Sequence, residues 1–192
     1  MERKNPRILA LDPGTNCGYS WLDIPQPVPG TLNPYRHQSG VWRLSTDRFT
    51  SQGMRFVMLK KYLMDVEPDF VAYELVNFPH KSTAAAQMYW GVVTTVLLFC
   101  EEYGVEYWPV PTGTIKKRAT GKGNAGKPQM IQAANVEFEI DPPLNDSKAS
   151  TNTDDNIADA MWIAKCAIES FAYVLTKRDP TRDKETLNVG EE

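Results

Sequence analysis

The sequence predicts an α/β fold in which a mixed five-stranded sheet is flanked by helices. Two observations carry this prediction. Three short apolar runs, separated by turn residues, occupy the first 45 residues and predict an antiparallel meander. Beyond them, apolar strands alternate with long helical patterns, which places successive strands parallel to one another. A chain of 192 residues with 42% hydrophobic content is long enough to bury one substantial core.

The first strand is the apolar run at residues 8–11, which is too short for a helix and ends on Asp12. Pro13, Gly14 and Gly18 are expected to end this strand and lead into a second one over residues 18–22. A buried carboxylate is costly unless it is paired or binds a metal ion. Asp12 could instead cap the turn by accepting hydrogen bonds from the amides that follow. Both interpretations of Asp12 stay open at this point.

The next segment, residues 25–34, is rich in proline and predicts an irregular loop. A third strand follows at residues 36–44. Apolar residues then recur at helical spacing over residues 47–66, with Asp47 as the expected N-cap and Pro68 as the stop.

The fourth strand, residues 69–74, is again a short apolar run that ends in an acid, Glu74. Because a helix connects it to the earlier strands, it is expected to lie parallel to the first strand. Glu74 would then lie at the same end of the sheet as Asp12.

A long helix is predicted from a cap at Ser82 or Thr83 to Tyr103. Its middle, residues 88–100, is apolar nearly all round, which is typical of a core helix or of one half of a subunit interface. The longest apolar run, at residues 92–100, contains two threonines and is too short to span a bilayer. The N-terminus is polar, and the three cysteines form no CxxC pair, so a soluble cytoplasmic protein is predicted.

The rest of the chain predicts one more strand and three helices within a single domain over residues 1–176. In order, these are a strand at 105–110, a short helix at 112–118, a Gly/Lys loop at 120–127, a helix at 128–138, a polar linker at 141–153 and a helix at 154–175. Residues 177–192 are charged and poor in apolar side chains, so we predict a disordered tail.

Four acids stand at special places in these elements: Asp12, Glu74, Asp155 and Asp159. The last two are four residues apart on one face of a helix. Alternatively, their negative charges could serve only to stabilise the N-terminus of that helix. Carboxylates gathered in one cleft stay ionised only when a cation compensates them. Oxygen ligands without His or Cys select Mg²⁺ or Mn²⁺. Two such ions about 4 Å apart would activate a water molecule and stabilise the leaving oxygen of a phosphodiester.

The positive charges are segregated, although the net charge of −3 gives no general sign of nucleic-acid binding. No acid lies between Pro111 and Val136. Lysines among glycines suit contact with phosphate groups, because bare backbone amides can approach closely. A solvated charged loop is the alternative interpretation. The basic residues are Lys116, Lys117, Arg118, Lys122 and Lys127.

Taken together, the motifs resemble those of the RuvC-like Holliday junction resolvases, in particular their phage-encoded branch. The matching pieces occur in the family's order: Ile-Leu-Ala-Leu-Asp-Pro-Gly-Thr from residue 8, Tyr-Glu ending at Glu74, Thr-Gly-x-Gly-x-Ala-x-Lys from Thr120, and Ala-Asp-Ala around Asp159. The resemblance implies a ribonuclease H-like fold, a homodimer, and Mg²⁺-dependent endonuclease action on four-way DNA junctions. Together with the carboxylate pattern, we expect two Mg²⁺ ions in each active site, with Mn²⁺ as a substitute.

The resemblance also implies roles for individual residues. Asp12, Glu74 and Asp159 match the family's first, second and last catalytic acids. The DNA contacts would come from Lys116 and Lys127, with Lys117, Arg118 and Lys122 beside them, and from Phe78 and Lys81 in the loop after the second acid. The helix that starts near Thr83 would form the dimer interface.

One position departs from the family pattern. Bacterial members often carry an acid or a histidine three residues before the last Asp, where this chain has Asn156. Acids lie four and five residues before it, at Asp155 and Asp154. We assign Asp155 as the third ligand because four residues return to nearly the same helix face, and Asp154 is its rival.

Other functions suit parts of the same pattern. A nuclease of the same fold could cut flaps, forks or RNA–DNA hybrids, and a junction-binding protein could lack catalysis altogether. An actin-like or Hsp70-like ATPase is a further alternative, because Asp-Pro-Gly-Thr also suits a phosphate-binding hairpin, but those folds need two such halves and many more residues than 192.

Overall fold

The computed structural model describes residues 5–24, 36–45, 51–76, 82–146 and 153–177, with the side chains of 171–177 left out. It contains the predicted five-stranded sheet, in the order β3-β2-β1-β4-β5. The first three strands are antiparallel, and β4 and β5 continue parallel to β1, as predicted. The strands are β1 Arg7–Asp12, β2 Asn16–Asp23, β3 His37–Arg43, β4 Phe70–Leu75 and β5 Glu106–Pro111.

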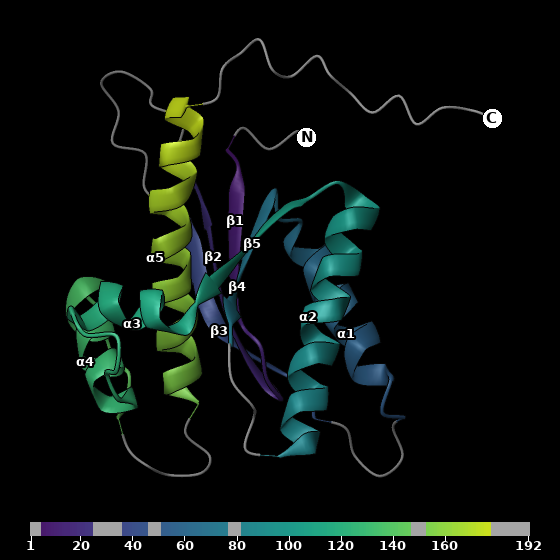
Figure 1. Cartoon of the computed structure of the whole chain (residues 1–192), viewed down its shortest axis with the longest axis horizontal. Coiled ribbons are helices and arrows are strands. Elements are labelled where there is room, and N and C mark those ends of the chain that lie inside the picture. Colours follow the sequence, from purple (N-terminus) through teal and green to yellow (C-terminus); the bar gives the residue numbers. More distant parts are fainter. Residues whose placement is uncertain (1–4, 25–35, 46–50, 77–81, 147–152, 178–192) are drawn as a thin grey trace.

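Five helices within the described residues cover the two faces of the sheet (Figure 1). On one face lies α5, with α3 and α4 beside it, and on the other face lie α1 and α2. The helices are α1 Met54–Val66, α2 Thr83–Tyr103, α3 Thr112–Thr120, α4 Lys127–Glu137 and α5 Asp154–Lys177.

Strand alternation divides the interior into two apolar clusters. In β1, Ile8 and Ala10 face α5, whereas Leu9 and Leu11 face α1 and α2. The parallel neighbour β4 repeats this division, with Ala72 toward α5 and Val71 toward α2. The face on which each strand-end side chain emerges is therefore set by this alternation.

The first helix is shorter than predicted. It begins at Met54 with Gly53 as its N-cap, and a turn at residues 52–53 precedes it, so the predicted start at residue 47 is wrong. Glycine is a poor helix former, which is consistent with a start after it. The expected cap, Asp47, lies outside the described residues.

The long helix α2 has the predicted bounds and caps. The side chain of Ser82 accepts a hydrogen bond from the backbone amide of Ala85 at 3.2 Å, and Gly104 ends the helix with φ of 65°. By length and composition alone α2 could cross a membrane. Its buried side chains, including Tyr89, Val92 and Val96, belong instead to the apolar cluster between the sheet and helices α1 and α2.

Candidate active site

Two of the predicted acids lie side by side at the ends of β1 and β4. The parallel register pairs Ala10 with Ala72 and Leu11 with Tyr73, so Asp12 and Glu74 follow at adjacent positions. Since Ala10 and Ala72 face α5, alternation turns Asp12 and Glu74 toward the same helix. The expectation that the two acids share one end of the sheet is confirmed.

A glycine brings α5 onto this end of the sheet. Gly18 pairs with Asp12 across β1 and β2. A Cβ atom at Gly18 would lie 2.6 Å from the carbonyl carbon of Asn156, and closer still to its oxygen. Only a residue without a side chain therefore permits the first turn of α5 to lie here. Gly18 lies inside β2, so the expectation that it ends the preceding strand is wrong.

The helix places Asp155 and Asp159 within electrostatic reach of the strand acids. Burial raises the pKa of Asp12 well above its ordinary value, and the charges of Asp159, Glu74 and Asp155 raise it further. Burial also raises the pKa of Asp159 to about 7, with Glu74 and Asp155 adding to the effect. The four acids thus form one carboxylate cluster, which we define as Asp12, Glu74, Asp155 and Asp159.

The rival acid Asp154 points elsewhere. Its side chain accepts a hydrogen bond from the backbone amide of Asn145 at 2.7 Å. Asp155 instead forms an ion pair with Lys127 and acts on the pKa of Asp12 and Asp159. The geometry of the cluster therefore includes Asp155 and leaves Asp154 at its edge.

Two residues that the sequence reasoning missed hold Glu74. The hydroxyl of Thr112, the first residue of α3, donates to Oε1 of Glu74 at 2.7 Å. The hydroxyl of Tyr89 on α2 donates to the backbone carbonyl of Glu74 at 3.1 Å and accepts from the amide of Val76. Thr112 directly follows β5, the parallel neighbour of β4, and that position was the available signal.

The predicted basic residues fall into different surroundings. Lys116 and Lys127 lie close enough to lower the pKa of Asp159, and Lys127 also binds Asp155. Arg118 makes a bidentate ion pair with Glu169 of α5, with nitrogen–oxygen distances of 2.5–2.9 Å. Lys117 and Lys122 are exposed, and Lys122 lines a groove between α3 and α4. Phe78 and Lys81 lie outside the described residues.

The donor chemistry of the cluster fits hard divalent cations. It consists of carboxylate oxygens, whose mutual repulsion a cation would relieve. Within the described residues, no three acids, imidazoles or thiols stand close enough together to hold a metal ion as they are. The ammonium group of Lys127, bound to Asp155, supplies one positive charge at this place. Metal binding would therefore require these side chains to rearrange.

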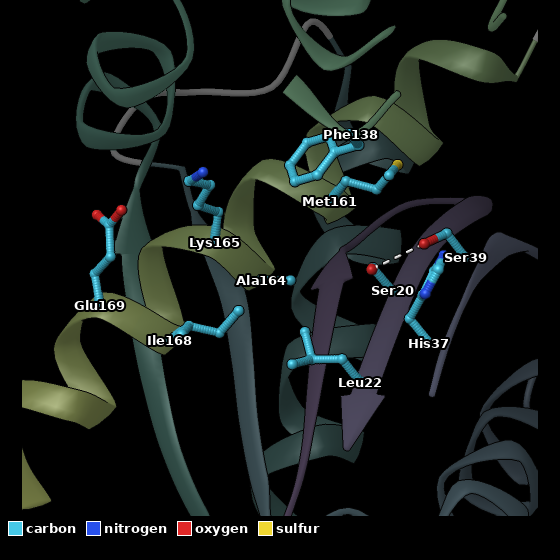
Figure 2. Close-up of a pocket in the computed structure, with 10 residues that line it drawn as sticks. All are labelled: Ser20, Leu22, His37, Ser39, Phe138, Met161, Ala164, Lys165, Ile168 and Glu169. Carbon is cyan, nitrogen blue, oxygen red and sulfur yellow. Dashed lines mark hydrogen bonds between the residues drawn. The ribbon is translucent and has the colours of Figure 1, made fainter. Parts of the chain in front are cut away.

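A separate apolar cavity of about 330 Å³ lies between α5 and strands β2 and β3 (Figure 2). None of the four clustered acids lines it. Its walls are mainly apolar, with a hydrogen bond of 2.9 Å between Ser39 and Ser20 on the strand side. This cavity is distinct from the carboxylate cluster.

The sequence is similar to bacterial crossover junction endodeoxyribonucleases named RuvC. It is 30% identical over 172 residues to the enzyme of Chlamydia muridarum, covering 86% of this chain and 93% of that protein. It is 27% identical over 164 residues to the enzyme of Synechococcus sp. (strain CC9311), covering 82% of this chain and 95% of that one. No protein-family profile matches the sequence.

Solved structures share the fold at lower identity. Thermus thermophilus RuvC bound to a Holliday junction superposes with a TM-score of 0.60 at 20% identity, covering 86% of this chain and 96% of that one. The yeast mitochondrial Holliday junction resolvase Ydc2 superposes with a TM-score of 0.62 at 15% identity, covering 91% of this chain and 82% of that one. These likenesses confirm the predicted ribonuclease H-like fold of the RuvC type.

Proposed function

Because the chain belongs to the RuvC family of crossover junction endodeoxyribonucleases, we propose that it resolves four-way DNA junctions by hydrolysing phosphodiester bonds. The observation that supports this most is the carboxylate cluster, which joins the ends of β1 and β4 to the first turns of α5. Lys116 and Lys127 stand beside it. Negative charge to hold cations and positive charge to hold phosphate meet at one place, as phosphodiester hydrolysis requires.

In this proposal the four clustered acids hold two Mg²⁺ ions, with Mn²⁺ as a substitute. The bound ions would supply Lewis-acid activation of a water molecule and stabilise the leaving oxygen. Asp12, buried between the other acids, would contribute to both sites. Lys116 and Lys127 would bind the phosphate backbone next to the scissile bond. Lys127 would have to leave Asp155 in order to do so, because the two are paired in the free protein.

The remaining DNA contacts follow the positions of the other basic residues. Exposed Lys117 and Lys122 extend the basic surface along α3 and the following loop. Phosphate would compete with Glu169 for Arg118, so we expect this contact to be weaker than those of the free lysines. Phe78 and Lys81 are proposed to contact the junction from the loop after β4.

We propose a homodimer that pairs α2 of the two subunits and makes two nicks across one junction. Large apolar side chains remain exposed on α2 in the single chain, with Trp90 at 55% and Leu98 at 64% exposure. Exposed apolar patches of this kind mark interaction surfaces. The protein would act in the cytoplasm of a bacterial cell, as a single nuclease domain over residues 1–176.

The experiment compares labelled DNA substrates in Mg²⁺ and in Mn²⁺. A junction resolvase cuts the four-way junction in preference to flaps, forks, linear duplex and RNA–DNA hybrid. Equal cleavage of all branched substrates would indicate a broader nuclease of the same fold. Junction binding without cleavage in either metal would indicate a non-catalytic junction-binding protein.

A further inference from the structure

The carboxylate of Glu74 is held by a hydroxyl group that belongs to neither the cluster nor the basic loop. Oγ1 of Thr112 lies 2.7 Å from Oε1 of Glu74 and 3.4 Å from the backbone carbonyl oxygen of Leu75. A threonine hydroxyl has one hydrogen to donate, and the shorter contact to a charged acceptor is the stronger. Thr112 therefore donates to Glu74.

The acid is engaged on its other side as well. Burial raises the pKa of Asp12, and the nearby side chain of Glu74 raises it further, so the two carboxyl groups lie close together. Glu74 thus lies between Asp12 and Thr112. With both acids ionised, repulsion would drive them apart unless Glu74 were restrained from the side of Thr112.

The restraint is firm because α3 is anchored at more than one point. Ile115 is buried in the apolar cluster between the sheet and α5, and Arg118 forms an ion pair with Glu169 of α5. Thr112, at the start of this helix, is β-branched, so its χ1 angle is restricted. The hydroxyl is consequently presented to Glu74 by a fixed scaffold that links β4 with α5.

We propose that Thr112 is a positioning residue that orients the carboxylate of Glu74 for binding a divalent cation together with Asp12. This inference rests on the proposed metal-dependent function. Partners that orient a metal ligand typically change metal affinity about 10- to 100-fold when removed. Thr112 would act on metal binding through Glu74, without itself touching the metal ion or the DNA.

The test measures Mn²⁺ binding directly, by the electron paramagnetic resonance signal of free Mn²⁺, alongside junction cleavage. Thr112→Val keeps the shape of the side chain and removes the donor. We expect it to weaken Mn²⁺ binding by about tenfold or more and to raise the Mg²⁺ concentration for half-maximal cleavage by a similar factor. Thr112→Ser restores the donor and should restore both values. Junction affinity in the presence of a chelator should not change.

Two controls separate positioning from general damage. Thr114→Val makes the same substitution at an exposed position of the same helix and should leave Mn²⁺ binding unchanged. In the Glu74→Gln background, Thr112→Val should cause no further loss of Mn²⁺ affinity, because its effect passes through the missing carboxylate.

The outcomes distinguish this inference from the proposed function. If the wild-type protein neither binds Mn²⁺ nor cuts junctions, the proposed function itself is wrong. If the wild-type protein does both and Thr112→Val matches it, Thr112 does not position Glu74. If Thr112→Val lowers Mn²⁺ affinity as much in the Glu74→Gln background as in the wild-type protein, the inference is also wrong, because Thr112 would then act by another route.

Discussion

Gly18 of β2 lies directly under the backbone of Asn156, so that the first turn of α5 rests on the sheet with no side chain between them. A Cβ atom there would lie 2.6 Å from the carbonyl carbon of Asn156. This contact sets how near Asp155 and Asp159 come to Asp12.

Gly18→Ala should therefore damage the site more than the addition of one methyl group suggests. Because backbone atoms must move, we expect a loss of about 1–3 kcal/mol in the free energy of unfolding and at least a tenfold loss of Mn²⁺ affinity. Gly53→Ala is the matched control, since a Cβ atom there meets nothing within 4 Å. Chemical denaturation and Mn²⁺ titration provide the measurements. Equal behaviour of the two variants would contradict the role given to Gly18.

The two neighbouring acids at the start of α5 should differ in importance. Asp155→Ala should abolish cleavage, because it removes a member of the carboxylate cluster. Asp154→Ala should keep most of the activity, since Asp154 binds the backbone of Asn145 instead. Junction cleavage by each variant, at matched protein concentration, decides between them. If only Asp154→Ala is inactive, the assignment of the third ligand is wrong.

The metal-free protein should lose stability as the pH rises from about 4 to about 7. Burial raises the pKa of Asp159 from 3.8 to about 7, so in this window the folded state binds more protons than the unfolded state. The proton-linked stabilisation is complete below pH 4 and is lost as the pH passes 7. Asp12, whose pKa is also raised, contributes in the same direction. Thermal unfolding with a chelator at a series of pH values measures this.

Asp159→Asn gives the control for the pH effect. It should flatten the fall in stability between pH 4 and pH 7, because the titrating group is gone. Millimolar Mg²⁺ should restore the stability of the wild-type protein at pH 8 and should have less effect on the variant. A wild-type protein equally stable from pH 4 to pH 8 without metal would show that folding does not raise the pKa of Asp159.

Replacing Lys127 should have opposite effects on metal and on DNA. Lys127→Met removes the cation that pairs with Asp155, so Mn²⁺ should bind more tightly. It also removes one phosphate contact, so junction affinity should fall. The slope of log affinity against log salt concentration should become shallower by about one. Lys61→Met, at an exposed position of α1 on the other face of the sheet, is the control. Weaker Mn²⁺ binding by Lys127→Met would contradict the pairing.

The dimer should depend on the exposed apolar face of α2. Trp90→Glu should convert a particle of twice the 21.7 kDa chain mass into a single chain, as measured by light scattering. Val136→Glu changes an apolar residue of α4 that is 80% exposed and should leave the mass unchanged. A wild-type protein that is monomeric at micromolar concentration would remove the paired-nick proposal.

The sequence predicted the elements that local pattern determines. The apolar runs that end in Asp12 and Glu74 predict two parallel strands, and the register of these strands confirms that both acids lie at one end of the sheet. The spacing of Asp155 and Asp159 placed them on one helix face because that periodicity is intrinsic to the helix. The start of α1 was misjudged because the apolar pattern continued across a turn.

The contacts between distant segments could not be predicted in this way. The packing of Gly18 under Asn156 and the hydrogen bond from Thr112 to Glu74 join residues 138 and 38 positions apart in the chain. No periodicity or motif specifies either pair; the position of Thr112 directly after β5 places it near the end of β4 but does not identify Glu74 as its partner. They follow from how the helices dock on the sheet, which only the three-dimensional arrangement shows.

Junction resolution by this protein can be measured by incubating the purified protein with an end-labelled four-way junction, with and without Mg²⁺. We expect paired nicks that depend on Mg²⁺ or Mn²⁺ and that disappear in Asp12→Asn, while this variant still binds the junction. Cleavage by Asp12→Asn at the wild-type rate, or no cleavage by the wild-type protein in either metal, would contradict it.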